Sequence, residues 1–279
     1  MISFGNSYYN LDENFQISFL ILFIFSFLPL QADWVLENGE ELTYSAKWTG
    51  IPAGEIEMKT VKMPRLGENM YEFRLKASTS AFWSMVYKVR DTIHSRVNAK
   101  EKRAYYFYKD VKQGRRHLEE KSTISYEGNK IIHSKQNFSA KENANIKEIE
   151  LDEVKQQKIL DPLSIIYLLR SIDFSKQDVS EQFNIFAGKG IYELKYLKKK
   201  SDTISTRAFG SREVWLVEPS ASYKGGIVDA GRLQLWIDKK TGIALKLMFH
   251  IPVGWATLEL KKSNNSQLKS KSTGFFRRR

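Results

Sequence analysis

Apolar and polar residues alternate along much of the chain after residue 40. The alternation is clearest at residues 41–48, where every second side chain from Leu42 onward is apolar and those between are polar. This period of two is typical of a β-strand with one buried and one solvent-facing side. It resumes at residues 55–59 after the turn-forming residues 50–54, and again at residues 71–77. Three consecutive antiparallel strands, a meander, are therefore expected.

The same pattern predicts further strands in both halves of the chain. Residues 127–129 and 238–242 are rich in turn-forming types, and each separates two such segments, which predicts hairpin connections. The further strands are expected at residues 87–97, 104–111, 118–126, 130–138, 191–197, 212–217, 232–237, 243–251 and 255–260. So many strands in series predict a mainly β fold.

One segment, residues 161–170, follows a helical pattern instead. Asp161 stands where an N-cap belongs, and Pro162 stands at the first helical position, where its missing N–H costs nothing. The apolar residues that follow cover nearly the whole circumference, so the helix must be buried on most sides. We expect it to lie against the concave face of a strongly curved antiparallel sheet or open half-barrel. It would either fill the core there or cover a cavity as a movable lid.

An apolar run from Ile17 to Leu30 precedes the β-rich region. It is shorter than the roughly 20 residues of a spanning helix, and it ends in a small-residue cleavage pattern at Ala32. We interpret residues 1–32 as a signal peptide. The first 16 residues contain two acids and no base, unlike an ordinary signal peptide, so an uncleaved membrane anchor is the alternative. In either case the protein is expected to be exported, and to be periplasmic or membrane-associated.

The remaining chain is expected to form a single β-rich domain, residues 33–260, followed by a tail, residues 261–279. Cysteine is absent, which excludes disulfides, thiolate metal sites and a cysteine nucleophile. The net charge is +12, and the tail contains seven bases and no acid. Such a segment is too polar to fold alone, so we expect a disordered basic tail that is either merely solvated or binds an anionic surface. Export argues against nucleic acid as the partner.

The main candidate for a functional side chain is Asp91, which lies on the apolar side of its predicted strand. A carboxylate there is costly unless it is paired or hydrogen-bonded. It would anchor a ligand head group, act as an acid or base with a raised pKa, or accept bonds from backbone N–H groups or an arginine. The run 81–85 is either a loop at a pocket mouth or core filler. The candidate ligand-binding residues are Asp91, Trp83, Tyr87, Ile166 and Tyr167.

The sequence contains no recognisable catalytic or metal-binding constellation. The four histidines lie on separate segments without partners at metal-ligand spacing, and there is no G-x-S-x-G motif. Residues 188–190 lack the third glycine and the following helix of a phosphate-binding loop, so we interpret them as a hairpin turn. We therefore assign no catalytic residue, no metal and no cofactor.

Several short motifs together resemble a known family. They are Gly39–Tyr44 with Trp48, Gly50–Gly54, Tyr87–Asp91, Asp161–Ser164, Trp236–Asp238 and Pro252–Gly254. In these the chain resembles, from about Trp34 to Leu260, the exported bacterial proteins grouped as domain of unknown function 3108. The resemblance implies an envelope protein with a strongly curved antiparallel sheet, and it implies no settled activity. A more distant analogy is to periplasmic lipoprotein carriers, whose open half-barrels hold acyl chains under helical lids, although such an analogy does not establish function.

Three functions remain open on this basis. The first is a non-enzymatic envelope protein that binds or carries a lipid or other amphiphile in a β cavity. The second is a structural or assembly factor that binds an envelope protein through its surface. The third is a hydrolase of envelope glycans, which would need a second carboxylate facing Asp91 across a groove.

Overall fold

Strands β1 (Glu41–Trp48), β2 (Ile51–Lys62) and β3 (Met70–Thr79) form the predicted meander, because β2 pairs antiparallel with both β1 and β3. The computed structural model describes residues 34, 36–151, 158–175, 182–188, 190–223, 226–228, 233–250 and 254–268. The predicted leader and most of the predicted tail lie outside these ranges. None of the helices in the described ranges is long and apolar enough to cross a membrane.

The remaining elements follow in chain order. The strands are β4 (Val89–Asn98), β5 (Arg103–Gln113), β6 (Arg116–Ser125), β7 (Lys130–Asn137), β8 (Asn145–Glu150), β9 (Ile159–Leu160), β10 (Gln182–Phe186), β11 (Ile191–Thr206), β12 (Gly210–Tyr223), β13 (Gly226–Val228), β14 (Leu233–Asp238), β15 (Ala244–His250) and β16 (Trp255–Ser263). The helices are α2 (Ala81–Val86) and α3 (Ser164–Leu168), with the 3-10 turns η2 (Phe138–Ala140) and η3 (Leu169–Ser171).

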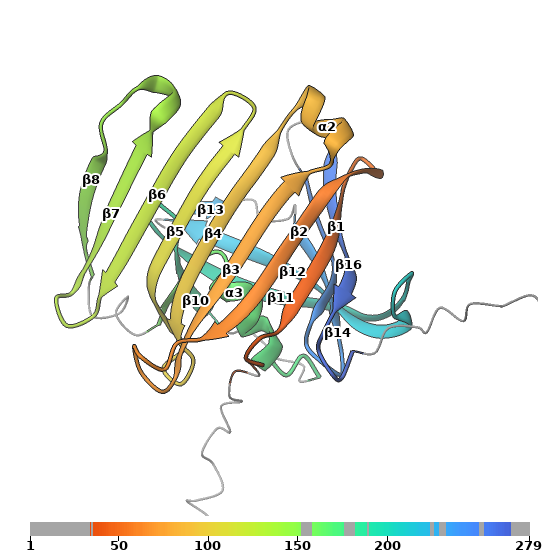
Figure 1. The fold of residues 1–279 in the computed structure, drawn as a ribbon. Helices are drawn as coiled ribbons and strands as arrows, with labels where there is room; N and C mark the ends of the chain where they lie inside the picture. The colour runs from red at the N-terminus through yellow and green to blue at the C-terminus, as the bar shows by residue number, and fades with distance from the viewer. Residues whose placement is uncertain are drawn as a thin grey trace, which may run out of the picture. The chain divides into compact units, whose positions relative to one another are not determined.

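All these strands belong to one sheet (Figure 1). Its order is β8-β7-β6-β5-β4-β3-β2-β1-β16-β15-β14-β12-β11-β10-β9, with β13 paired to β12. Neighbours are antiparallel except β9 and β10, which are parallel. The first and last strands of the described chain, β1 and β16, pair with each other, so the two halves of the chain join in one continuous sheet. The predicted fold class is confirmed: a mainly β protein with a curved, open antiparallel sheet and a short buried helix.

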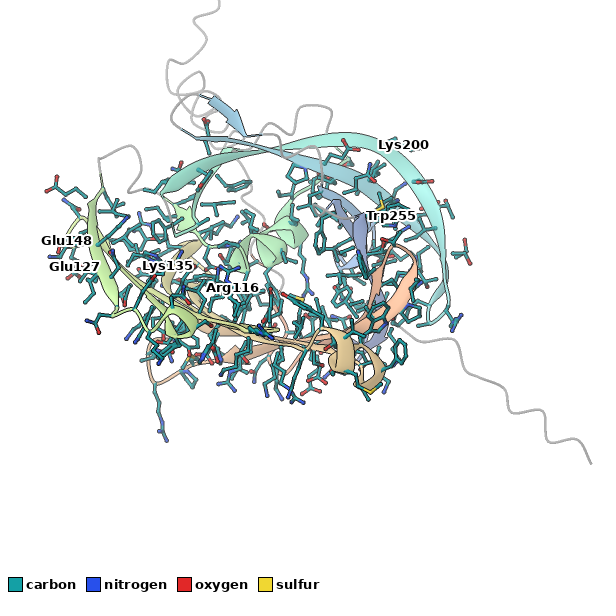
Figure 2. All side chains as sticks on the ribbon, turned by 90° about the horizontal axis from the view of Figure 1, so that it is seen from above. Arg116, Glu127, Lys135, Glu148, Lys200 and Trp255 are labelled. Atoms are coloured by element: carbon teal, nitrogen blue, oxygen red, sulfur yellow. The ribbon has the colours of Figure 1, made fainter. Side chains whose placement is uncertain are left out.

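The sheet curls so that its second half faces its first half, with α3 between them (Figure 2). Backbone pairing does not close the ring in the described strands, since β8 and β9 are its edges. Side chains make the contact instead. The Phe186 ring of β10 meets the His133 ring of β7 edge-on, with centroids 5.6 Å apart. Tyr126 donates from its hydroxyl to the carbonyl of Ala104, 2.8 Å away, and lies 3.2 Å from that of Ile159 in β9.

Helix α3 fills one end of this interior, which is one of the two roles expected from its sequence. The carboxylate oxygen Oδ1 of Asp161 accepts hydrogen bonds from the backbone N–H groups of Leu163 and Ser164, at 2.9 and 3.0 Å, so Asp161 caps the turn that leads into α3. The Tyr167 ring stacks on Phe73 of β3 with ring centroids 3.7 Å apart. Both rings are fully buried, so this end of the interior is a packed core.

A buried ion pair fixes the end of this helical segment to the sheet. Arg170 of η3 donates from Nη1 to Glu40, just before β1, at 2.6 Å, and both side chains are almost inaccessible to solvent. The β14–β15 turn packs on the same residue. Gly242 of that turn has a φ of +68°, and a Cβ there would lie 2.8 Å from the Cα of Arg170, so only glycine fits.

Strand boundaries differ from the prediction mainly in the second half of the chain. β11 continues to Thr206 through a polar stretch that hides its period of two, and β8 and β10 were not predicted. β16 continues to Ser263, and Leu268 lies in the core. The sheet and its packing therefore extend beyond the predicted domain boundary at residue 260, into the segment expected to be a disordered tail.

Candidate binding pocket

An apolar pocket of about 610 Å³ lies at the opposite end of the meander from Phe73 and α3. Ends of β1 to β5, β15 and β16 form its walls, and α2 stands at its mouth. The lining residues are Ala46, Lys47, Trp48, Ala53, Gly54, Glu55, Ile56, Ala77, Ser78, Thr79, Trp83, Val86, Tyr87, Val89, Gln113, Phe249, Ala256 and Leu258. A pocket of this size and composition suits an apolar ligand.

The pocket exists because smaller residues occupy inward-facing positions toward this end of the sheet. Along β1 they change from Leu42 and Tyr44, which are buried and bulky, to an alanine. Gly54 of β2 pairs directly with this alanine, Ala46, and Ala256 of β16 pairs with the next inward residue of β1, Trp48. The small residues that line the pocket from the four central strands are Ala46, Gly54, Ala77 and Ala256. Large side chains fill the interior at one end of the sheet and small ones leave it open at the other.

The run 81–85, expected to be either a loop at a pocket mouth or core filler, belongs instead to the short helix α2, which has no buried residue and lies at the pocket. Trp83 donates from its indole N–H to the carbonyl of Pro52 at 2.7 Å, and its ring meets Trp48 edge-on with centroids 5.7 Å apart. Ser84 lies 2.9 Å from the hydroxyl of Thr79. These contacts hold one side of α2 against the β1–β2 hairpin and β3. Phe82, Met85 and Val86 remain exposed.

The exposed side chains of α2 belong to a larger apolar surface around the mouth. It is formed by the β1–β2 hairpin, by α2 with the residue after it, and by the start of β16 (Figure 2 labels Trp255). We call this surface the apolar rim, and it consists of Trp48, Ile51, Phe82, Met85, Val86, Tyr87 and Trp255. Met85 and Val86 are 78% and 73% exposed. Exposed apolar patches of this kind are typical of surfaces that bind a protein or a membrane.

Asp91 lies next to the pocket without lining it. It faces inward opposite Ala77, and its carboxylate accepts hydrogen bonds from the side chain of Gln113, at 2.5 Å, and from the backbone N–H of Lys112, at 3.1 Å. Burial raises the pKa of Asp91 more than these bonds lower it. Asp110, the nearest carboxylate on β5, pairs with Thr92 and so projects from the other face of the sheet. The two carboxylates therefore do not face each other across one groove.

The five candidate ligand-binding residues fall into two separate places. Trp83 and Tyr87 line the pocket, and Asp91 is bonded to the lining residue Gln113. Ile166 and Tyr167 belong to α3 in the packed core and do not line this pocket. The sequence analysis did not identify the small inward-facing residues. These residues leave the space that forms the pocket. An alanine or glycine at one inward position in each of four neighbouring strands, near the same strand ends, would have indicated it.

Three of the four histidines have structural partners among the described side chains. His133 is buried, its Nδ1 lies 3.0 Å from the hydroxyl of Ser122, and burial lowers its pKa. His117 lies 2.9 Å from Asp110, and His94 lies 3.6 Å from Glu72. Within the described ranges, no three histidine, aspartate or glutamate side chains are placed to hold a metal ion together.

Fold and pocket together define a class of protein: an open, curled antiparallel sheet with a packed core at one end and an apolar pocket at the other. The chain belongs to the family described as protein of unknown function (DUF3108), whose family model matches residues 43–261. The resemblance found in its short motifs is thus confirmed. The family carries no assigned activity.

One solved structure supports the fold assignment. A β-barrel-like protein of the domain of unknown function DUF1849 from Brucella abortus is similar with a TM-score of 0.52 and 10% sequence identity, over 81% of this chain and 97% of that one. A protein with a YmcC-like fold from Bacteroides fragilis aligns over 84% of this chain and all of its own, with a TM-score of 0.32 and 8% identity. No curated protein shows significant sequence similarity to the chain.

Proposed function

We propose that this protein binds the apolar chain of a lipid or similar amphiphile in the pocket beside α2, without catalysing a reaction, in the cell envelope. The observation that carries the proposal is the pocket itself: apolar walls, small inward residues and an open mouth at the end of an otherwise packed sheet. Burial of hydrocarbon there is favourable by roughly 25 cal/mol for each Å² removed from water. The apolar run Ile17–Leu30, interpreted as an export signal, supports the envelope location.

The architecture favours an amphiphile over a wholly apolar ligand. The mouth opens between exposed residues of α2 and the β1–β2 hairpin, so a ligand longer than the pocket reaches solvent. A polar head group suits that position, because the head group stays hydrated while the apolar chain of the ligand is buried. Two polar side chains of the lining lie near Asp91 and α2: Gln113 donates to Asp91, and the hydroxyl of Thr79 lies 2.9 Å from that of Ser84 in α2.

A fluorescent fatty acid, 11-(dansylamino)undecanoic acid, tests the proposal directly. We expect saturable binding with one site per chain and a blue shift of the dansyl emission as the probe leaves water. Ala46→Trp places a bulky side chain into the pocket and is expected to weaken binding at least tenfold. The matched control is Ser205→Trp, because Ser205 is exposed and lines a second, more polar cavity of about 650 Å³.

Equal binding by the wild-type protein, Ala46→Trp and Ser205→Trp would contradict the proposal, as would no saturable binding by any of them. Circular dichroism and thermal unfolding of each variant establish that the sheet is intact. Ala77→Phe, which fills the pocket from β3, provides a second obstruction should Ala46→Trp fail to fold.

A further inference from the structure

We propose that the pocket end of the sheet docks on an anionic phospholipid surface, with the apolar rim inserted and flanking basic side chains on the lipid head groups. The inference goes beyond the proposed function and stands without it, because rim and charges are present whether or not the pocket is filled. If the pocket does take an acyl chain, docking places its mouth at a membrane that contains such chains.

The connections at this end form one continuous surface. The backbone N–H of Thr49, in the β1–β2 hairpin, donates to the carbonyl of Trp255 at 2.8 Å. The Trp83–Trp48 contact joins the hairpin to α2. The β5–β6 turn packs on the residue after α2, since a Cβ on Gly114 would lie 2.8 Å from the Tyr87 ring.

The surface continues from this turn to η2. The hydroxyl of Ser139 donates to the carbonyl of Arg115 at 2.8 Å and accepts from the backbone N–H of His117 at 2.5 Å. Phe138, which is 40% exposed, stacks on the His117 ring with centroids 4.5 Å apart. Apolar groups thus continue along this end from the hairpin to the link between β7 and β8.

The charged side chains on these connections are mainly basic. Among the described residues, five exposed bases at this end have no ion-pair partner, and we call them the basic flank: Lys88, Arg90, Arg115, Arg116 and Lys141. Glu142 is the exposed acid beside Lys141. Lys112 is paired with Asp110 at 2.6 Å and so adds little. This flank is complementary to a negative surface.

Aromatic residues next to basic ones fit a bilayer interface better than a protein partner. Tryptophan and tyrosine prefer the depth of the head groups, where an apolar ring meets a polar edge. Lysine and arginine beside them are attracted to anionic head groups. The rim is spread over several separate connections of one sheet end, as expected of a surface that meets a flat layer.

The absence of cysteine allows a site-specific test on the full chain. Met85→Cys is labelled with a nitrobenzoxadiazole dye, and Leu66→Cys is the matched control, because Leu66 is 55% exposed in the β2–β3 turn at the other end of the meander. Each is mixed with vesicles of pure phosphatidylcholine, or of phosphatidylcholine with about one third phosphatidylglycerol. We expect a several-fold rise and a blue shift of emission at position 85 on the anionic vesicles only, and no change at position 66.

Charge reversal tests the basic flank. Arg115→Glu with Arg116→Glu is expected to reduce the position-85 response several-fold. Lys62→Glu with Arg65→Glu changes the net charge equally at the other end of β2 and is expected to leave it intact. Ala46→Trp is also expected to leave it intact, so that failure of docking and failure of pocket binding are distinguished.

Three results would overturn the docking proposal. Equal responses at positions 85 and 66 would mean that another part of the chain carries the protein to the vesicle. Equal responses at position 85 on both vesicle types would show that docking does not require anionic lipid. No change in the emission of the dye at position 85 on either vesicle type would show that the apolar rim does not insert into a bilayer, and would favour a protein partner for it.

Discussion

Two inward-facing carboxylates, Asp91 and Asp161, show how hydrogen bonding decides the role of a buried acid. Sequence singled out Asp91 for its place on an apolar face, and the structure gives it an amide and a backbone N–H as donors. Asp161 is more deeply buried and has three donors: the backbone N–H groups of Leu163 and Ser164, and the hydroxyl of Ser95 at 2.5 Å. The N-cap motif could be predicted because it is local, whereas the bond from Ser95 joins residues 66 positions apart.

The pH dependence of folding tests the environment of Asp161. Burial raises its pKa above the ordinary 3.8, and the hydrogen bonds from Ser95 and the helix offset only part of this. Between about pH 3.8 and the raised pKa, the folded state therefore keeps a proton that the unfolded state has lost. The stability that this group contributes falls as pH rises through that range. The Asp161→Asn variant has no ionisable group at this position, so its free energy of unfolding does not fall with pH for this reason.

Urea unfolding of wild type and Asp161→Asn from about pH 3 to about pH 7 measures the difference. We expect the free energy of unfolding of the wild type, relative to the variant, to decrease as pH rises. A difference that is constant or increases with pH would show that the carboxylate is not desolvated in the folded protein.

Among the elements, the two helices were predicted with unequal success for a physical reason. The turn that leads into helix α3 has the capping residue Asp161 and a proline, and the helix is apolar on nearly all sides, so its existence and burial follow from local sequence. Helix α2 has six residues, no side-chain cap and no buried residue. Its position depends on tertiary contacts such as the bond from Trp83 to Pro52, which no local pattern contains.

Substitutions in α3 distinguish a core plug from a movable lid. Because Tyr167 is fully buried and stacked on Phe73, Tyr167→Ala is expected to lower the free energy of unfolding by about 3–5 kcal/mol. Tyr167→Phe keeps the stack and should cost much less. Chemical denaturation measures both, and dansyl fatty acid binding by Tyr167→Phe should equal that of the wild type. A small cost for Tyr167→Ala together with altered binding would favour a lid.

At the scale of the whole molecule, the strands were largely predictable and their arrangement was not. Alternation marks β1 to β7 because each has one wet face, whereas the polar second half of β11 has no such contrast. The pairing of β1 with β16 joins residues more than 200 positions apart, and it decides which inward residues share the pocket. Ala46 and Ala256 are thus brought together by topology, which a single sequence does not reveal.

The central claim is that the open end of this sheet holds an apolar chain, and native mass spectrometry of protein purified without detergent tests it most directly. The account predicts a wild-type mass that exceeds the chain by one amphiphile. The excess should be lost in Ala46→Trp and retained in Ser205→Trp. A wild-type mass equal to the chain alone, unchanged after incubation with added lipid, would contradict it.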